Sequence, residues 1–224
     1  MTTDTQANPS AVGYAALVRG NANFRNLWLG QIVSLLGDWF NLIASAALVG
    51  MLTQSGLAIG SLFVVRMLAP FLISPIAGVV ADRYNRKHIL IAADLVRAAT
   101  VFGFLLVREP GDVWLLYALT AVQLGLSGFF FPARNAILPD ITTQEELGAA
   151  NALSSATWSV MLALGAALGG LVSGTWGIYP AFVIDGLTFL LSAVFIWRVQ
   201  VHSVPALNAS EKSVAAAVGQ YVDG

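Results

Sequence analysis

The amino-acid sequence predicts an all-α integral membrane protein that crosses the lipid bilayer six times. Hydrophobic residues make up 57% of the chain and charged residues only 10%, whereas a soluble domain carries about 25% charged residues. The apolar residues gather in six long runs, and each run approaches the ~20 residues that a helix needs to cross the hydrocarbon core. The runs do not alternate between apolar and polar residues, as the strands of a membrane barrel do.

The six predicted spans follow one another with short connections. They run over residues 27–51, 57–81, 88–107, 113–131, 149–175 and 178–199. The first run is long enough to be retained rather than removed as a leader. The fourth run is followed by Pro132, where a helix is expected to end. The polar or small residues at the two ends predict a mobile arm over 1–23, a transmembrane domain over 24–200 and a tail over 201–224.

Positive charge predicts the orientation of these spans. The chain has 11 Lys and Arg residues. One of them, Arg108, falls on one side of the predicted topology, and Arg66 and Arg97 lie inside spans. The other eight fall on the opposite side, and they are Arg19, Arg25, Arg83, Arg86, Lys87, Arg134, Arg198 and Lys212. Because short cytoplasmic loops collect positive charge, we expect both termini in the cytoplasm and the protein in the cell membrane.

The first span carries one polar stripe on an otherwise apolar helix. Its residues are spaced by three or four positions, which keeps them within about 80° of one helical face, and they are Gln31, Ser34, Asp38, Asn41 and Ser45. Such a stripe favours the wall of a water-filled pathway, although hydrogen bonding between helices would give the same pattern. Asp38 has no cation within its own turn, so either proton coupling or a fixed ion pair is open to it.

Other ionisable residues inside the spans are expected to find partners, because a lone charge in the bilayer is costly. Asp94 and Arg97 are three residues apart and can form an ion pair. Arg66 is expected to reach Asp38 or Asp185, with Asp38 preferred because consecutive helices tend to be neighbours. A weaker polar face on the fourth span includes Thr120, Gln123 and Ser127, and Arg134 continues it if the helix survives Pro132.

Four glycines on the fifth span form small-xxx-small pairs, a pattern that lets membrane helices approach closely. They are Gly165, Gly169, Gly170 and Gly174. The remaining features exclude several classes of protein. Without cysteine there is no disulfide, thiol catalysis or zinc–thiolate site, and the net charge of −1 gives no indication of a nucleic-acid partner. No phosphate loop, nucleophile with its base, or metal cluster stands out, so we expect no enzymatic activity, cofactor or metal.

The loop after the second span resembles a known signature. Its Gly78, Asp82, Arg83, Arg86 and Lys87 match the G-x-x-x-D-R-x-G-R-K pattern of major facilitator superfamily transporters, with Asn85 at the glycine position. Residues 165–170 resemble the G-P-x-x-G-G motif of antiporter members, with Ala166 in place of proline. Further stretches resemble the drug and siderophore exporter branch, namely residues 37–39, 94–97, 131–134, 138–140 and 182–185. The resemblance covers residues 20–200.

This resemblance implies a fold and a function. Family members are two six-helix halves, each a 3+3 inverted repeat, with the substrate site between the halves. The chain would be the N-terminal half of a proton- or ion-coupled exporter of small amphiphilic molecules such as drugs or siderophores. Its partners would be the lipid bilayer, that substrate, and a missing C-terminal half or a second copy. Residues 218–224 resemble the start of the central segment. The alternative is a non-transporting six-helix fragment or scaffold that binds a partner.

Overall fold

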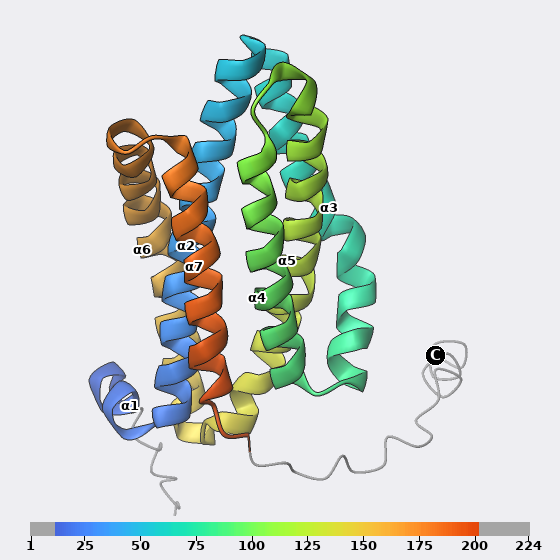
Figure 1. Ribbon diagram of the computed structural model, residues 1–224. Helices are drawn as coiled ribbons and strands as arrows, with labels where there is room; N and C mark the ends of the chain where they lie inside the picture. Colours follow the sequence, from blue (N-terminus) through green and yellow to red (C-terminus); the bar gives the residue numbers. More distant parts are fainter. Residues whose placement is uncertain (1–11, 202–224) are drawn as a thin grey trace, which may run out of the picture.

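The computed structural model describes residues 12–201. Figure 1 shows a bundle of helices, and the described residues contain no strand. Its helices are α1 (Tyr14–Gly20), α2 (Ala22–Thr53), α3 (Gly56–Arg83), α4 (Arg86–Gly103), α5 (Val113–Ile141), α6 (Gln144–Thr175) and α7 (Ile178–Trp197), with 3₁₀ turns at Phe104–Leu106 and Pro110–Asp112. The six helices α2 to α7 are long and apolar enough to cross a membrane. This confirms the predicted fold class.

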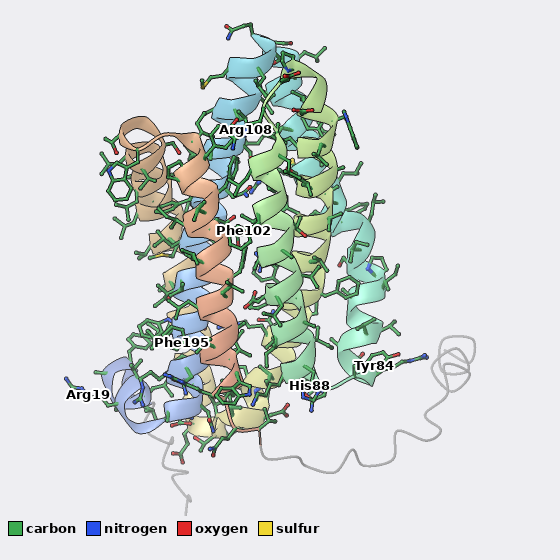
Figure 2. The ribbon with its side chains drawn as sticks, in the orientation of Figure 1. Arg19, Tyr84, His88, Phe102, Arg108 and Phe195 are labelled. Carbon is green, nitrogen blue, oxygen red and sulfur yellow. The ribbon has the colours of Figure 1, made fainter. Side chains whose placement is uncertain are left out.

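The two ends of the bundle differ in the turns that they hold. One end, called here the Arg86 end, holds α1, the α3–α4 and α5–α6 turns and the last turn of α7 (Figure 1). The other, called the Arg108 end, holds the remaining turns. In Figure 2 the labelled Arg19, Tyr84 and His88 lie toward the Arg86 end, away from Arg108. Both limits of the described chain therefore lie at the Arg86 end, as an even number of spans requires.

The helices pack in a reciprocal pattern. Helix α2 packs mainly against α6 and α7, α5 packs mainly against α3 and α4, and α4 packs against α7. The first helix of each three-helix set thus contacts the second and third helices of the other set, which is the arrangement expected of a 3+3 repeat. Helices α2 and α3, although consecutive, touch each other much less. The labelled Phe102 lies between α4 and α7 (Figure 2), where a Cβ on Gly186 would lie 2.8 Å from its ring.

Helices α3 and α6 lie at the edges of the bundle and are poorly covered. Within the most apolar 18-residue stretch of each helix, only 6% of the α3 residues and 17% of the α6 residues are buried, compared with 44–50% in the other four spans. Exposed apolar side chains on these two helices include Met67, Phe71, Trp158 and Leu171. These surfaces are suited to lipid or to a further set of helices.

Helix α5 continues where the sequence predicted a loop. It runs through Pro132 and Pro139 to Ile141, so the connection predicted over 132–148 shrinks to Thr142 and Thr143. A proline removes one backbone hydrogen bond, but membrane helices tolerate this loss where neighbouring helices support the bend. Helix α3 packs along α5 and provides such support. The extension places Arg134 and Asp140 on a helix instead of in a loop.

The structure describes only part of the two predicted terminal segments. Within the arm predicted over 1–23, α1 covers residues 14–20, and its Leu17 is fully buried in a core cluster. The predicted tail lies outside the described residues from 202 onward. Asn85 stands at the glycine position of the loop signature. Its φ of −61° is ordinary, and its side chain caps α4 by accepting a hydrogen bond from the His88 N–H.

The four glycines of α6 do not act alike. A Cβ on Gly165 would lie 2.6 Å from Cγ of Trp39, and one on Gly169 would lie 3.2 Å from the Trp39 backbone oxygen. Both glycines therefore allow α6 to approach α2 closely. A Cβ on Gly170 or Gly174 would meet nothing within 4 Å. Of the four glycines, only Gly165 and Gly169 lie where another helix of the described residues approaches closely, and a packing role for Gly170 and Gly174 stays a prediction.

Candidate functional site

A group of polar side chains lies inside the bundle, away from both ends. Burying a polar group without a partner is unfavourable, so each of these residues needs a partner or a function. The buried polar residues are Ser34, Asn41, Ser45, Asp94, Arg97, Thr120, Gln123, Ser127, Arg134, Ser154, Thr157, Asp185, Thr188 and Ser192. They come from α2, α4, α5, α6 and α7, and the partly buried Asp38 and Arg66 join them.

Arg97 is the centre of this group. Its Nη2 donates to both carboxylate oxygens of Asp38, at 2.9 and 2.8 Å, and its Nη1 donates to Asp94 at 3.4 Å. The guanidinium also lies 3.9 Å from the ring centroid of Phe189 and 5.6 Å from that of Phe130. Arg97 therefore links α4 to α2 through an ion pair and to α5 and α7 through cation–π contacts.

The predicted partner of Asp38 was Arg66, and the structure corrects this. Arg66 makes no ion pair within 4.0 Å among residues 12–201, and its buried Nη1 has no hydrogen-bond partner there. The expectation failed because α3 carries Arg66 along α5 and not along α2. Arg97 reaches Asp38 instead.

Asp185 lies on α7 and is fully buried. Its carboxylate accepts a hydrogen bond from the Gln123 side chain at 3.5 Å, and no cation lies within 4.0 Å of it in the described part of the chain. The expected ion pair is therefore not seen. Gly37 permits the close approach of α2 at this level, because a Cβ on Gly37 would overlap the Asp185 carboxylate and the Thr188 hydroxyl.

A small cavity lies between α2, α4 and α5. Its volume is about 40 Å³, which is room for a few water molecules. It is lined by Gln31, Ser34, Leu35, Asp38, Arg97, Phe130, Phe131 and Arg134. The cavity therefore combines an ion pair, a second arginine and two aromatic rings. Asp38 is the carboxylate in its lining, and 21% of the Asp38 side chain is exposed.

The polar stripe of α2 divides at Asp38. Gln31, Ser34 and Asp38 line the cavity, as a pathway would require. Asn41 and Ser45 lie nearer the Arg108 end and are fully buried, and the Ser45 hydroxyl donates to the Asn41 side chain at 3.2 Å. Gln123 is buried as well and is not part of the cavity lining. The stripe thus lines a cavity over one part of its length and is buried between helices over the other.

Arg134 joins three helices through neutral groups. Its Nη2 donates to the Gln31 side-chain oxygen at 2.7 Å and to the Ser154 hydroxyl, and its Nη1 donates to the Asn135 side chain at 3.2 Å. Gln31 in turn donates to the Ser154 backbone oxygen at 3.3 Å. The Nε of Arg134 is buried and has no partner among the described residues.

The loop signature at the Arg86 end forms one ion pair. Arg86 Nη1 lies 2.7 Å from Asp140 Oδ2 and also donates to the Ala136 backbone oxygen at 3.2 Å. Asp82 and Arg83 are exposed, and a Cβ on Gly78 would meet nothing within 4 Å. Sequence reasoning missed Asp140 as a partner because it was placed in a loop. Within residues 12–201 no three His, Cys, Asp or Glu side chains are placed to hold a metal ion.

Comparisons with known proteins agree with this architecture. A sequence profile of the family described as Major Facilitator Superfamily matches residues 27–221. YfiS of Bacillus subtilis, described as an uncharacterized MFS-type transporter, is 32% identical over 81% of this chain and 43% of its own length. The putative bacilysin exporter BacE of the same species is 29% identical over 85% of this chain and 47% of its own.

A third relative is the macrolide efflux protein A of Streptococcus pyogenes. It is 26% identical over 80% of this chain and 44% of its own length. The chain thus spans about half the length of the curated relatives that it matches.

Proposed function

This chain belongs to the Major Facilitator Superfamily, and on that basis we propose that it forms the N-terminal six-helix half of an exporter that works by alternating access. In such transporters two halves rock about a central site. The observation that carries the proposal is the polar cavity between α2, α4 and α5, where a bundle held together only by packing would have apolar side chains. The poorly covered faces of α3 and α6 also support it, since a second half would cover them.

We propose that the Asp38–Arg97 pair couples the cycle to a proton or ion gradient. Asp38 lines the cavity, whereas its partner Arg97 is almost fully buried and also holds Asp94. A proton or cation that reached Asp38 would compete with Arg97 for the carboxylate and would free the guanidinium to shift toward Asp94. The Arg97 side chain would then have two positions, one at Asp38 and one toward Asp94. An antiport mechanism requires such a pair of states on the wall of the pathway.

The orientation of the bundle, and the residues that would contact a second half, are proposed from the distribution of charge. Arg19, Arg83 and Arg86 lie at the Arg86 end, so we propose that this end faces the cytoplasm of the cell and that the protein resides in the cell membrane. Asp82, Arg83 and Lys87, which make no ion pair within the described residues, would contact the second half there. Arg86 would hold the α3–α4 turn against α5 through Asp140.

The substrate class is proposed from the cavity and the relatives together. Two of the relatives are named as exporters of bacilysin and of macrolides. Phe130 and Phe131 offer aromatic surface, while Gln31 and Ser34 offer hydrogen bonds. We therefore propose a small amphiphilic molecule as the substrate, in the class of drugs and siderophores, and we propose no catalytic activity.

A non-transporting scaffold remains the second candidate, because Asp38 is paired as a scaffold would require. Asp185 and Arg134 form no ion pair within residues 12–201. This favours a transporter instead, since a scaffold would be expected to pair every buried charge.

Transport by reconstituted protein tests the proposal. We expect that the 224-residue chain alone in liposomes with a pH gradient will not move lipophilic dyes. It should do so when a matching six-helix half, such as the C-terminal half of an exporter relative, is supplied. The reason is that the substrate site lies between the halves. Gradient-driven dye movement by the chain alone would instead indicate a homodimeric half-transporter. No movement with any second half would favour the scaffold.

A further inference from the structure

Arg134 differs from Arg97, the other arginine that lines the cavity, in the charges around it. Arg97 is neutralised by Asp38 at 2.8 Å and by Asp94 at 3.4 Å. Arg66, which lies on α3, is not part of the cavity lining. No carboxylate lies within 4.0 Å of Arg134 in residues 12–201, and its three side-chain partners are an amide, a hydroxyl and a second amide.

Burial makes this lack of a counter-ion significant. The Arg134 residue is 6% exposed, so water screens its charge poorly, and an uncompensated charge at such a position is strongly unfavourable. Arginine does not escape by losing its proton under ordinary conditions. The neutral partners supply hydrogen-bond acceptors but no negative charge. Because no acidic side chain of the described residues neutralises the buried Arg134 guanidinium, its counter-ion has to come from outside the bundle.

The space for such a counter-ion lies beside Arg134. The side chain lines the 40 Å³ cavity, and its buried Nε–H still lacks a hydrogen-bond partner. The Ser34 hydroxyl and the Gln31 amide share the lining, and Phe130 and Phe131 add aromatic surface. Arg97 also lines this cavity, but its charge is already satisfied by two carboxylates. Within the cavity, Arg134 is thus the cation that remains available.

We propose that this cavity binds an anion through Arg134. This inference rests on the proposed function. The anion is either the carboxylate of the transported molecule or a free anion such as chloride, and the same guanidinium would hold both. A carboxylate suits the geometry because arginine binds it with paired N–H donors. A cavity of about 40 Å³ holds only the carboxylate, so the apolar part of an amphiphilic substrate would lie outside it, against the 46% exposed Phe131. The transported class would be lipophilic acids or zwitterions in preference to simple cations.

Binding of matched probes to the purified chain tests this inference without any transport. The probes are 2-naphthoate, which carries a carboxylate, 2-naphthamide, which is neutral and nearly equal in shape, and sodium chloride. Titration calorimetry on the chain in lipid nanodiscs should show that 2-naphthoate binds at least about tenfold more tightly than 2-naphthamide, since a hydrogen-bonded charge pair is worth about one decade or more in affinity. Competition by chloride would identify a free anion as the natural occupant. Its failure to compete would identify the substrate carboxylate.

Variants assign the effect to Arg134. Arg134→Gln should reduce the affinity for 2-naphthoate to that for 2-naphthamide, and Arg134→Lys, which keeps the charge, should retain part of the preference. Arg19→Gln removes a charge from the exposed α1 and should change nothing. Equal binding of the two naphthyl probes by the native chain would overturn the inference, and so would a full tenfold preference in Arg134→Gln. If that variant does not fold, the probe comparison on the native chain still decides. Because no gradient or second half is involved, a failure of transport would leave this result untouched.

Discussion

Replacing Arg97 with glutamine is expected to destabilise the bundle by about 3–5 kcal/mol, the cost of removing one partner from a buried ion pair. The guanidinium is 2% exposed and serves two carboxylates, one of which, Asp94, is completely buried. Its loss would leave Asp94 charged without a partner and would also remove the cation–π contact with Phe189. Thermal or denaturant unfolding of the purified chain in detergent, followed by circular dichroism, measures the effect.

Two further variants separate charge from packing at this position. Adding Asp94→Asn to Arg97→Gln removes the uncompensated charge, so the double variant should be more stable than Arg97→Gln alone. Arg108→Gln is the control, because Arg108 stacks on Tyr179 at the bundle end and makes no ion pair with the other residues that the structure describes. Its effect should stay within about 1 kcal/mol. An Arg97→Gln chain as stable as the native one would show that the Asp38–Arg97–Asp94 cluster does not hold the bundle together.

A leucine at position 165 is expected to have the second largest effect on stability. The first added carbon would lie 2.6 Å from Trp39 Cγ and 2.8 Å from Trp39 Cβ, which is closer than any normal contact. Either the indole must leave its site or α6 must move away from α2. Overpacking of this kind costs about 1–3 kcal/mol, and we expect Gly165→Leu to be at the upper end because the Trp39 Cβ cannot move without its helix.

Gly170→Leu provides a matched control on the same helix. It makes the same chemical change five positions later, where a Cβ meets nothing within 4 Å. In detergent its melting temperature should stay close to that of the native chain, while that of Gly165→Leu falls by several degrees. Equal melting temperatures for the two variants would mean that α6 does not pack on α2 through Gly165.

The spans were predictable because each one depends only on the composition of one continuous segment of the chain. A run such as 178–199 is apolar over the length of a bilayer crossing, and no tertiary contact is needed to recognise it. Helix starts were also within reach, since Asn85 and Thr143 are good N-cap residues placed directly before their helices. The spacing of Asp94 and Arg97 likewise places two opposite charges on one helical face.

The partners across helices were not predictable in this way. Asp38 pairs with Arg97, 59 positions away, because α4 and α2 both pack against α7. That packing could not be predicted from the order of residues in the sequence. The rule that consecutive helices are neighbours pointed to Arg66 and was wrong here. The end of α5 was missed for a related reason. Pro132 by itself predicts that the helix ends there. Helix α5 continues because α3 packs along it, and this contact comes from a different part of the sequence.

The same limit applies to the glycines and to the α2 stripe. Gly165 and Gly170 look equivalent in the sequence, and only the position of Trp39 distinguishes them. Ser34 and Ser45 lie on one face of one helix, yet one lines a cavity and the other is buried against Asn41. Spacing gives the face of a helix. Whether that face meets water or another helix depends on the helices packed around it.

The central claim, that the cavity beside α2 is part of a water-filled pathway, is tested most directly by thiol accessibility. The chain contains no cysteine, so a single introduced thiol reports alone. Ser34→Cys and Ser45→Cys are matched substitutions on one stripe, eleven residues apart. Each is treated in membranes with a small water-soluble methanethiosulfonate reagent, and the labelled fraction is compared with that after denaturation. Ser34→Cys should be labelled and Ser45→Cys should stay unlabelled until the chain unfolds. Equal labelling of the two, or protection of Ser34→Cys, would contradict a pathway that follows α2 as far as Asp38.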